Sequence, residues 1–148
     1  MKVLIIIPAY NEEESIEKVI NNLKQNYSQY DYVIINDGSH DHTSEICHKN
    51  KYKIIDLPVN LGLTGAFQTG LKYAYKKGYD YAIQFDADGQ HLPEYIPAMV
   101  DKIEEGYDMV IGSRFVEKPK PRSLRMLGSR VISTAIKITT GVHIADPT

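Results

Sequence analysis

Five short and almost continuous apolar runs recur along the chain, and amphipathic segments separate them. The runs cover residues 3–7, 32–35, 53–57, 81–85 and 108–111. Their short length and their β-branched side chains are typical of strands that are buried on both faces, as in parallel sheets. The pattern therefore predicts five strands joined by helical crossovers.

The segments between these runs carry apolar residues at helical spacing, and a shorter helix is predicted over residues 43–49. Asn11 is a good N-cap for the first helix, since N-cap residues accept hydrogen bonds from the first turn. The apolar stripes are Ile16, Val19, Ile20 and Leu23; Phe67, Leu71, Ala74 and Tyr75, closed by Gly78; and, after Pro93, Ile96, Met99, Val100 and Ile103, closed by Gly106. Alternation of strands and helices predicts right-handed βαβ crossovers and a three-layer α/β/α sandwich with a mainly parallel sheet.

Length and composition fit one domain spanning residues 1–148. The 148 residues are 43% hydrophobic and 24% charged, and the net charge of −2 indicates no overall attraction to nucleic acid. The single cysteine, Cys47, excludes an internal disulfide and is interpreted as a small packing residue in a reducing compartment. No apolar run approaches the roughly 20 residues that cross a bilayer, so a cytoplasmic location is predicted.

The most informative polar residues are two carboxylates that follow the fourth apolar run. Asp86 and Asp88 share one side of the chain while it stays extended, and Gln90 lies one further step along. Such oxygen ligands suit a hard divalent cation. The same segment also fits a capping turn that leads into residues 92–94, and this alternative stays open.

Polar loops follow every predicted strand, at residues 8–14, 36–41, 60–62, 86–91 and 112–114. The carboxyl ends of parallel strands meet at one edge of the sheet, where a nucleotide is expected to bind. Taken singly, each loop also has an ordinary interpretation: Asn11 and Asp41 as helix caps, residues 36–39 as a turn, and Arg114 as a surface charge.

In order and spacing these loops resemble the motifs of the family 2 glycosyltransferases. The matching segments are Pro8-Ala9-Tyr10-Asn11-Glu12-Glu13, Asn36-Asp37-Gly38-Ser39, Asn60-Leu61-Gly62, Asp86-Ala87-Asp88-Gly89-Gln90-His91 and Gly112-Ser113-Arg114. The resemblance implies a GT-A fold and inverting sugar transfer. It is closest to the dolichyl-phosphate mannose synthase branch and its bacterial relatives, which move a sugar from a nucleotide diphosphate to a polyprenyl phosphate or a nascent glycan.

The resemblance also implies a donor site and a cation. The residues expected to border the base, the ribose and the diphosphate are Pro8, Tyr10, Glu12, Asp37, Asn60, Gly62 and Asp86. Mg²⁺ or Mn²⁺ would be held against the diphosphate by Asp86, Asp88 and Gln90. Such a cation stabilises the charge that develops on the departing nucleoside diphosphate.

Further residues are assigned to catalysis and to the acceptor by the same resemblance. Asp88 and Arg114 would act on the leaving group, while Arg125 and Ser129 would contact the phosphate of a lipid acceptor, although helical register also allows Arg130. Asp146 is a candidate general base for an alcohol acceptor, or an ordinary loop residue. The basic stretch over residues 118–137 fits either the inner face of a membrane or a solvated helix face.

Two departures from the family pattern bear on function. Leu63-Thr64-Gly65 stands where many members have a basic or small residue after the Asn-x-Gly motif, and the sequence stops inside a motif that begins at residue 145. The second departure predicts a chain truncated at its C-terminus. One alternative is therefore a sugar-nucleotide-binding fragment without transfer activity. A second alternative is a metal-dependent nucleotidyltransferase, although an enzyme of that class is expected to carry a glycine-rich, basic loop after its first strand.

Overall fold

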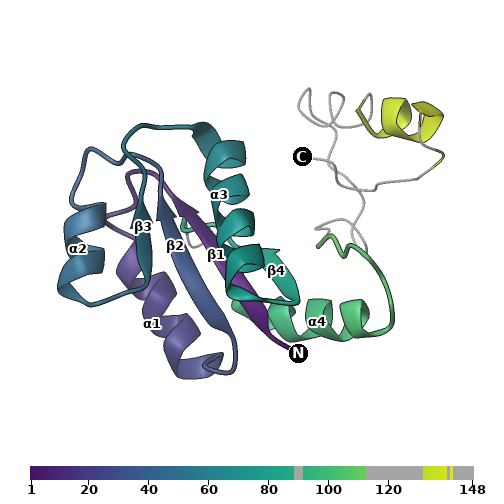
Figure 1. The fold of residues 1–148 in the computed structure, drawn as a ribbon, viewed down its shortest axis with the longest axis horizontal. Helices are drawn as coiled ribbons and strands as arrows, with labels where there is room; N and C mark the ends of the chain where they lie inside the picture. Colours follow the sequence, from purple (N-terminus) through teal and green to yellow (C-terminus); the bar gives the residue numbers. More distant parts are fainter. Residues whose placement is uncertain (89–91, 113–131, 140, 142–148) are drawn as a thin grey trace. The chain divides into compact units, whose positions relative to one another are not determined.

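The computed structural model describes residues 1–88, 92–112, 132–139 and 141, which fall into two compact units, 1–93 and 94–148. The first unit contains β1 (Val3–Ala9), α1 (Ile16–Asn26), β2 (Asp31–Asn36), α2 (Thr43–Lys49), β3 (Ile54–Asp56), α3 (Gly62–Lys77) and β4 (Tyr81–Gln84) (Figure 1). A 3₁₀ turn, Pro93–Tyr95, follows at the boundary. In the second unit lie α4 (Ile96–Glu104) and a helical segment over residues 132–139.

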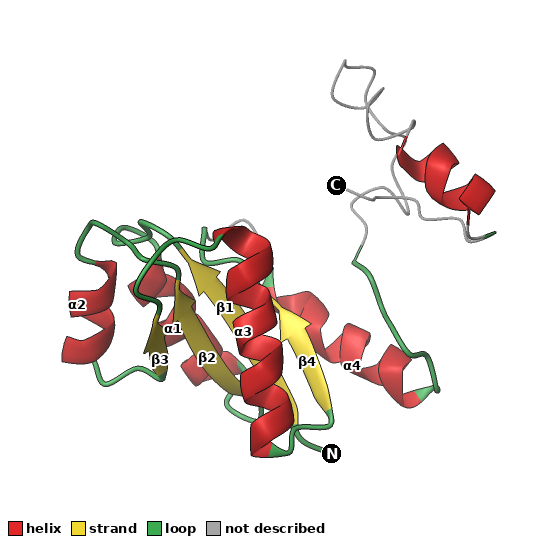
Figure 2. Ribbon diagram, turned by 45° about the horizontal axis from the view of Figure 1, so that its top comes forward, coloured by secondary structure: helices red, strands yellow, loops and turns green. Residues whose placement is uncertain are grey.

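The four strands form one parallel sheet with the order β3-β2-β1-β4. Ile6 of β1 is paired with Val33 of β2 on one side and with Gln84 of β4 on the other. Figure 2 shows α3 in front of the sheet and α1 behind it. The predicted α/β sandwich with a parallel sheet is confirmed.

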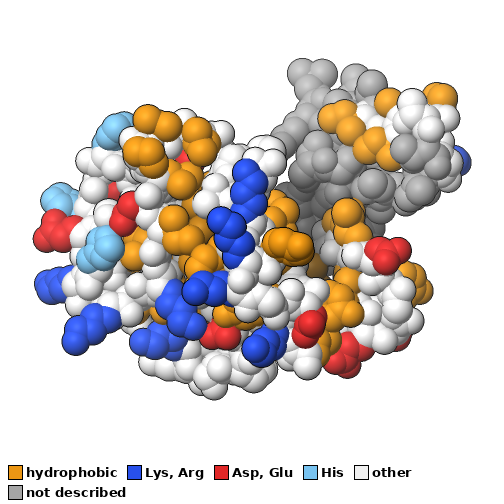
Figure 3. All heavy atoms as spheres, viewed as in Figure 1, with side chains coloured by type: hydrophobic (Ala, Val, Ile, Leu, Met, Phe, Trp, Pro, Cys, Tyr) orange, Lys and Arg blue, Asp and Glu red, His pale blue; other side chains and the backbone are white. Residues whose placement is uncertain are grey.

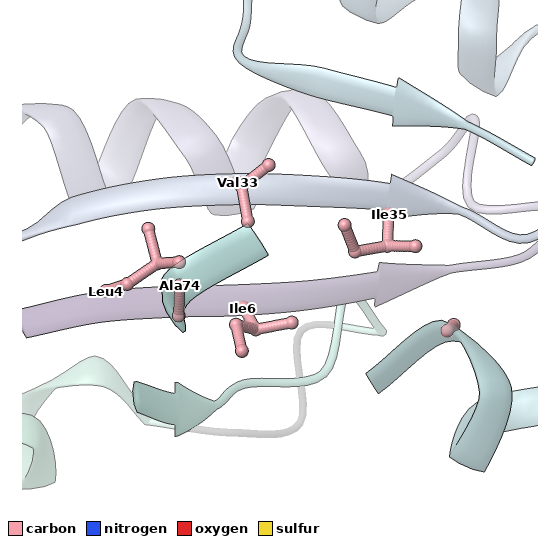
Figure 4. Packing of buried hydrophobic residues seen from close by; sticks show 6 residues of the cluster. Leu4, Ile6, Val33, Ile35 and Ala74 are labelled. Carbon is pink, nitrogen blue, oxygen red and sulfur yellow. The ribbon is translucent and has the colours of Figure 1, made fainter. Parts of the chain in front are cut away.

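The central strands are buried on both faces, which explains their continuous apolar runs. Every residue of β1 is buried. On the face covered by α3, Leu4 and Ile6 lie beside Val33 and Ile35, and Ala74 lies over them (Figure 4). The alternate residues of the same strands point to the opposite face, so both faces require apolar side chains.

Helix α3 contacts the sheet through small residues. Ala66, Gly70 and Ala74 are its buried positions, one turn apart, and a Cβ atom at Gly70 would overlap with Cγ2 of Ile6. The predicted stripe is therefore partly wrong: Leu71 is 41% exposed and Tyr75 is 87% exposed. Small residues allow the helix to approach the sheet closely, and the large apolar side chains point elsewhere.

The fifth predicted strand is absent. Residues 108–111 have no strand structure in the part of the chain that the structure describes, and Met109 and Ile111 are 72% and 51% exposed. A strand is stabilised by backbone hydrogen bonds to a neighbour. An apolar run without such a neighbour stays irregular.

The first helix begins later than predicted. Its N-cap is Ser15 instead of Asn11, which adopts a left-handed conformation with φ 56° in the preceding loop. The backbone carbonyl of Glu12 accepts a hydrogen bond from the Ile16 N–H at 2.9 Å and so begins the helical turn. The bounds of α2 and the end of α3 at Gly78, with φ 70°, agree with the prediction.

Two smaller expectations concern Cys47 and membrane crossing. Cys47 is fully buried, and burial raises the pKa of its thiol to about 11, which confirms its interpretation as a packing residue. Among the residues with a described structure, no helix has both the length and the apolar character needed to cross a bilayer.

Candidate functional site

A pocket of about 230 Å³ opens beyond the carboxyl ends of β1, β2 and β4, beside the first turns of α3. Ligands of parallel α/β sheets bind at this edge. The pocket is lined by Pro8, Ala9, Tyr10, Glu12, Asp37, Leu63, Ala66, Asp86, Ala87 and Asp88.

Most of the predicted donor-site residues therefore come together in one place. Those that line the pocket are Pro8, Tyr10, Glu12, Asp37, Asp86 and Asp88. They come from three strand ends that lie far apart in the sequence, and the sheet topology brings them side by side. Their roles toward a ligand remain predictions.

Asn60 and Gly62 support the pocket from outside its lining. The Asn60 side-chain oxygen accepts a hydrogen bond from the Gly62 N–H at 2.9 Å, and Oδ1 of Asp37 accepts one from the Leu61 N–H at 2.7 Å. Gly38, with φ 68°, lies so close that a Cβ atom there would be 2.8 Å from the Asn60 nitrogen. The Asn-x-Gly segment thus fixes the start of α3 against the loop after β2.

Five predicted site residues lie outside the described part of the chain. They are Gln90, Arg114, Arg125, Ser129 and Asp146. Their predicted roles in cation binding, phosphate contact and proton transfer remain predictions.

Helix α3 contributes a wall of the pocket that the sequence did not predict. Its residues Leu63 and Ala66 line the pocket together with Pro8 and Ala9 of β1. The small residues at positions 66, 70 and 74, spaced by four, were the available signal, because that spacing marks one helix face.

Asp86 and Asp88 reach the pocket where the chain leaves β4. The Phe85 N–H donates to the Ile6 carbonyl at 2.9 Å, which continues the sheet pairing by one residue. The chain then turns at residues 87–88, so the extended conformation on which the predicted alternation depends does not reach Asp88. Phe85 and Ala87 are buried, whereas Asp86 is half-buried and Asp88 is exposed, and both carboxylates line the pocket.

The pocket is acidic. Glu12, Asp37, Asp86 and Asp88 all line it, and its described lining contains no lysine, arginine or histidine. Like charges in one small space repel each other and repel any anion. A cation that accompanies a phosphorylated ligand would offset this repulsion.

The available donors fit a divalent cation that is shared with a ligand. Mg²⁺ usually takes one or two protein carboxylates, and waters and substrate phosphate oxygens complete its coordination. Asp86 and Asp88 supply that number of carboxylates from one wall. Within the described ranges no group of three or more His, Cys, Asp or Glu residues is placed to hold a metal ion.

The loop after β1 is fixed to the segment after β2 by three successive backbone amides. The N–H groups of Asn11, Glu12 and Glu13 donate to Ser39 Oγ at 3.0 Å, Thr43 Oγ1 at 2.8 Å and Asp41 Oδ2 at 3.1 Å, respectively. A phosphate-binding loop after the first strand needs its N–H groups for the ligand. Here the protein uses them itself, which disfavours the nucleotidyltransferase alternative.

Charged groups strengthen this connection. Glu13 Oε2 accepts the His42 N–H at 3.0 Å and lies 2.7 Å from its ring Nδ1, which lowers the pKa of Glu13 and raises that of His42. Burial alone would raise the pKa of Asp41, but hydrogen bonds from Thr43 outweigh it and the pKa is lowered. Both carboxylates therefore remain ionised as acceptors at neutral pH.

Comparison with known families gives one matching model, described as "Glycosyl transferase family 2", over residues 4–147. The UDP-N-acetylglucosamine–dolichyl-phosphate N-acetylglucosaminyltransferase of Methanococcus voltae is 36% identical over 166 residues, which cover 97% of this chain and 65% of that protein. The undecaprenyl-phosphate mannosyltransferase of Micrococcus luteus is 32% identical over 157 residues, covering 100% of this chain and 64% of that protein. The chain thus spans less than two thirds of these relatives.

Solved structures share the fold. Glucosyl-3-phosphoglycerate synthase from Mycobacterium tuberculosis, crystallised with Mn²⁺ and UDP-glucose, is similar with a TM-score of 0.60 and 22% identity, covering 71% of this chain and 40% of that one. TarS of S. aureus is similar with a TM-score of 0.55 and 26% identity, covering 79% of this chain and 24% of that one. The GT-A fold is thereby shown.

Proposed function

Because the chain belongs to glycosyl transferase family 2, we propose that it forms the donor-binding part of an inverting, metal-dependent glycosyltransferase. The sugar comes from a UDP- or GDP-sugar and passes to a polyprenyl phosphate or a cell-envelope glycan. The observation that carries the proposal is the position of Asp86 and Asp88 on one wall of a pocket at the carboxyl edge of the sheet.

The pocket offers different chemistry to the different parts of such a donor. Pro8 and Tyr10 present flat, largely apolar surfaces next to which a base can stack, and Asp37 and Glu12 present oxygens that accept hydrogen bonds from base or ribose. Asp86 and Asp88 would hold Mg²⁺ or Mn²⁺ against the diphosphate. When bound, the cation offsets the charge that grows on the leaving group.

The acceptor is proposed from the relatives. The proteins from Methanococcus voltae and Micrococcus luteus are described as acting on dolichyl phosphate and undecaprenyl phosphate. An ionised phosphate is already a nucleophile, so a polyprenyl phosphate acceptor needs no general base. Such an acceptor lies in a membrane, and we include in the proposal a cytoplasmic protein that works at the inner membrane face.

The test measures binding and transfer separately. UDP and GDP are titrated calorimetrically into the chain with Mn²⁺ and with a chelator, and nucleotide release from the matching sugar nucleotide is then followed with and without undecaprenyl phosphate. Cation-dependent binding of one nucleotide and lipid-dependent release are expected. Binding without transfer would instead support the sugar-nucleotide-binding alternative, and no binding of either nucleotide would overturn the proposal.

A further inference from the structure

We propose that Thr43 is a positioning residue for nucleotide binding. Its buried hydroxyl fixes the backbone of Glu12 and thereby holds the pocket wall to which Tyr10 and Glu12 contribute. That the ligand is a nucleotide rests on the proposed function, whereas the hydrogen bond between Thr43 and Glu12 belongs to the fold itself.

The Thr43 hydroxyl has a defined direction. It donates to Asp41 Oδ1 at 2.6 Å, and the same carboxylate oxygen accepts the Thr43 backbone N–H at 3.0 Å. A hydroxyl has one proton to donate, so its lone pairs are left to accept. The Glu12 N–H donates to this oxygen at 2.8 Å.

Glu12 is the point where the pocket and α1 meet. It lines the pocket, its carbonyl accepts the Ile16 N–H at 2.9 Å, and its Oε2 accepts the Ser15 hydroxyl at 2.6 Å. Thr43 is fully buried and is not among the residues that line the pocket. Its influence on a ligand therefore passes through Glu12.

The loop on this side has an uncommon backbone conformation. Asn11 has φ 56°, in the left-handed region that few residues other than glycine adopt, and asparagine adopts it more readily than most. Its N–H donates to Ser39, and its side-chain oxygen accepts the His40 N–H at 2.9 Å. The hydroxyl of Thr43 holds the next amide, so its loss allows the loop to move to other conformations.

The experiment compares two substitutions at this position in the full chain. Thr43→Val keeps the shape and removes the hydroxyl, whereas Thr43→Ser keeps the hydroxyl. UDP and GDP are titrated with Mn²⁺, and amide hydrogen exchange is measured by NMR. We expect Thr43→Val to weaken nucleotide binding and to speed exchange of the Glu12 amide by about tenfold each. Thr43→Ser should stay within about twofold of the wild type in both.

Thr69→Val is the matched control, because the Thr69 hydroxyl donates within α3 to the Gly65 carbonyl at 2.9 Å. It should change neither quantity. Thr43→Val with unchanged nucleotide affinity would overturn the inference. Faster hydrogen exchange at all β1 amides in both Thr43→Val and Thr43→Ser would also overturn it, since this pattern would indicate a general loss of stability. Failure of the wild-type chain to bind either nucleotide would instead overturn the proposed function.

Discussion

The acidic residues of this protein lie in two regions with different surroundings. Outside the pocket, Asp31 and Asp56 are paired with basic side chains: Asp31 lies 2.7 Å from Lys53 and Asp56 lies 2.7 Å from His48. In Figure 3, red acidic and pale blue histidine side chains lie together around α2, and several blue side chains lie near α3 with hydrophobic side chains between them. Within the pocket, Asp37 and Glu12 instead accept hydrogen bonds from neutral groups, the Leu61 N–H at 2.7 Å and the Ser15 hydroxyl at 2.6 Å, and no described lining residue is basic.

The difference is between carboxylates that a basic side chain of the chain itself balances and carboxylates that line the pocket. The hydrogen bond from Lys53 lowers the pKa of Asp31. Burial alone would raise the pKa of Asp56, but hydrogen bonds from Asn36, Ser44 and His48 outweigh it and lower the pKa. At both sites a basic side chain of the chain itself balances the carboxylate, whereas beside Asp86 and Asp88 the proposed function assigns this part to a cation that accompanies the ligand.

The largest expected effect is at the pocket. Asp88→Asn should weaken Mn²⁺-dependent nucleotide binding by about 100-fold, ~2.8 kcal/mol, because it removes a carboxylate donor to the cation. Its melting temperature should stay close to that of the wild type, since Asp88 is exposed. Calorimetry measures the affinity, and Asp80→Asn, just before the start of β4, removes the same charge at the opposite end of that strand from the pocket as a control. Equal affinities of Asp88→Asn and Asp80→Asn would contradict the pocket assignment.

Asp56→Ala should act on stability instead. Asn36 Nδ2 at 2.7 Å, Ser44 Oγ at 2.8 Å and His48 Nε2 at 2.7 Å would all lose a hydrogen-bond partner. We expect the free energy of unfolding to fall by about 1–3 kcal/mol. Urea denaturation measures this change, and nucleotide affinity should remain within about twofold. A large loss of affinity with unchanged stability would show that the two regions are not separate.

Asp31→Asn should have a smaller effect. The Asp31 and Lys53 side chains are each about half exposed, so water and salt screen their attraction. The expected loss of unfolding free energy is at most about 1 kcal/mol, and it should shrink further in concentrated salt. Urea denaturation at two salt concentrations checks this, and a loss independent of salt would point to packing instead of charge.

The smallest effect is expected from the Glu13–His42 pair, on the pH dependence of the free energy of unfolding. Because the pKa of His42 is raised in the folded state, its contribution to stability is fully present when the pH is below the ordinary pKa of 6.5. This contribution is lost as the pH rises through the folded-state pKa. The lowered pKa of Glu13 contributes above its ordinary value of 4.5 and is lost as the pH falls through the folded-state pKa. Together they favour folding most between these two values.

Urea denaturation of the wild type and of His42→Gln at pH 5.5 and pH 8.5 tests this. The wild type should be more stable than the variant at the lower pH, and the difference should shrink at the higher one. A difference that grows with pH would contradict the pairing of His42 with Glu13.

Two helices show what could be predicted from sequence. In α1, Ile16, Ile20 and Leu23 recur at helical spacing and are all buried, so periodicity identified both the helix and its inner face. In α3 the residues nearest the sheet are too small to dominate a hydrophobic pattern, and Leu71 and Tyr75 were wrongly assigned to the buried face. Periodicity detects burial of large side chains and misses close contact between small ones.

The same limit applies to the site. Asp86 and Asp88 were predicted at this edge because they follow an apolar run, and the ends of parallel strands in βαβ units meet at one edge of the sheet. The hydrogen bond between Glu12 and Thr43 joins residues 31 positions apart, and no rule of sequence spacing predicts it. Residues 108–111 were given a strand because an apolar run does not reveal whether a neighbouring strand is present.

The contact between Gly70 and Ile6 governs more than the core. Pro8 lies two residues past Ile6 on the same face of β1, and Ala66 lies one turn before Gly70 on the same face of α3. Both Pro8 and Ala66 line the pocket, so the distance between its two walls depends on the contact between Gly70 and Ile6, which lies outside the pocket lining. A Cβ atom at position 70 would therefore alter the width of the pocket as well as the packing of the core, without changing any residue that lines the pocket.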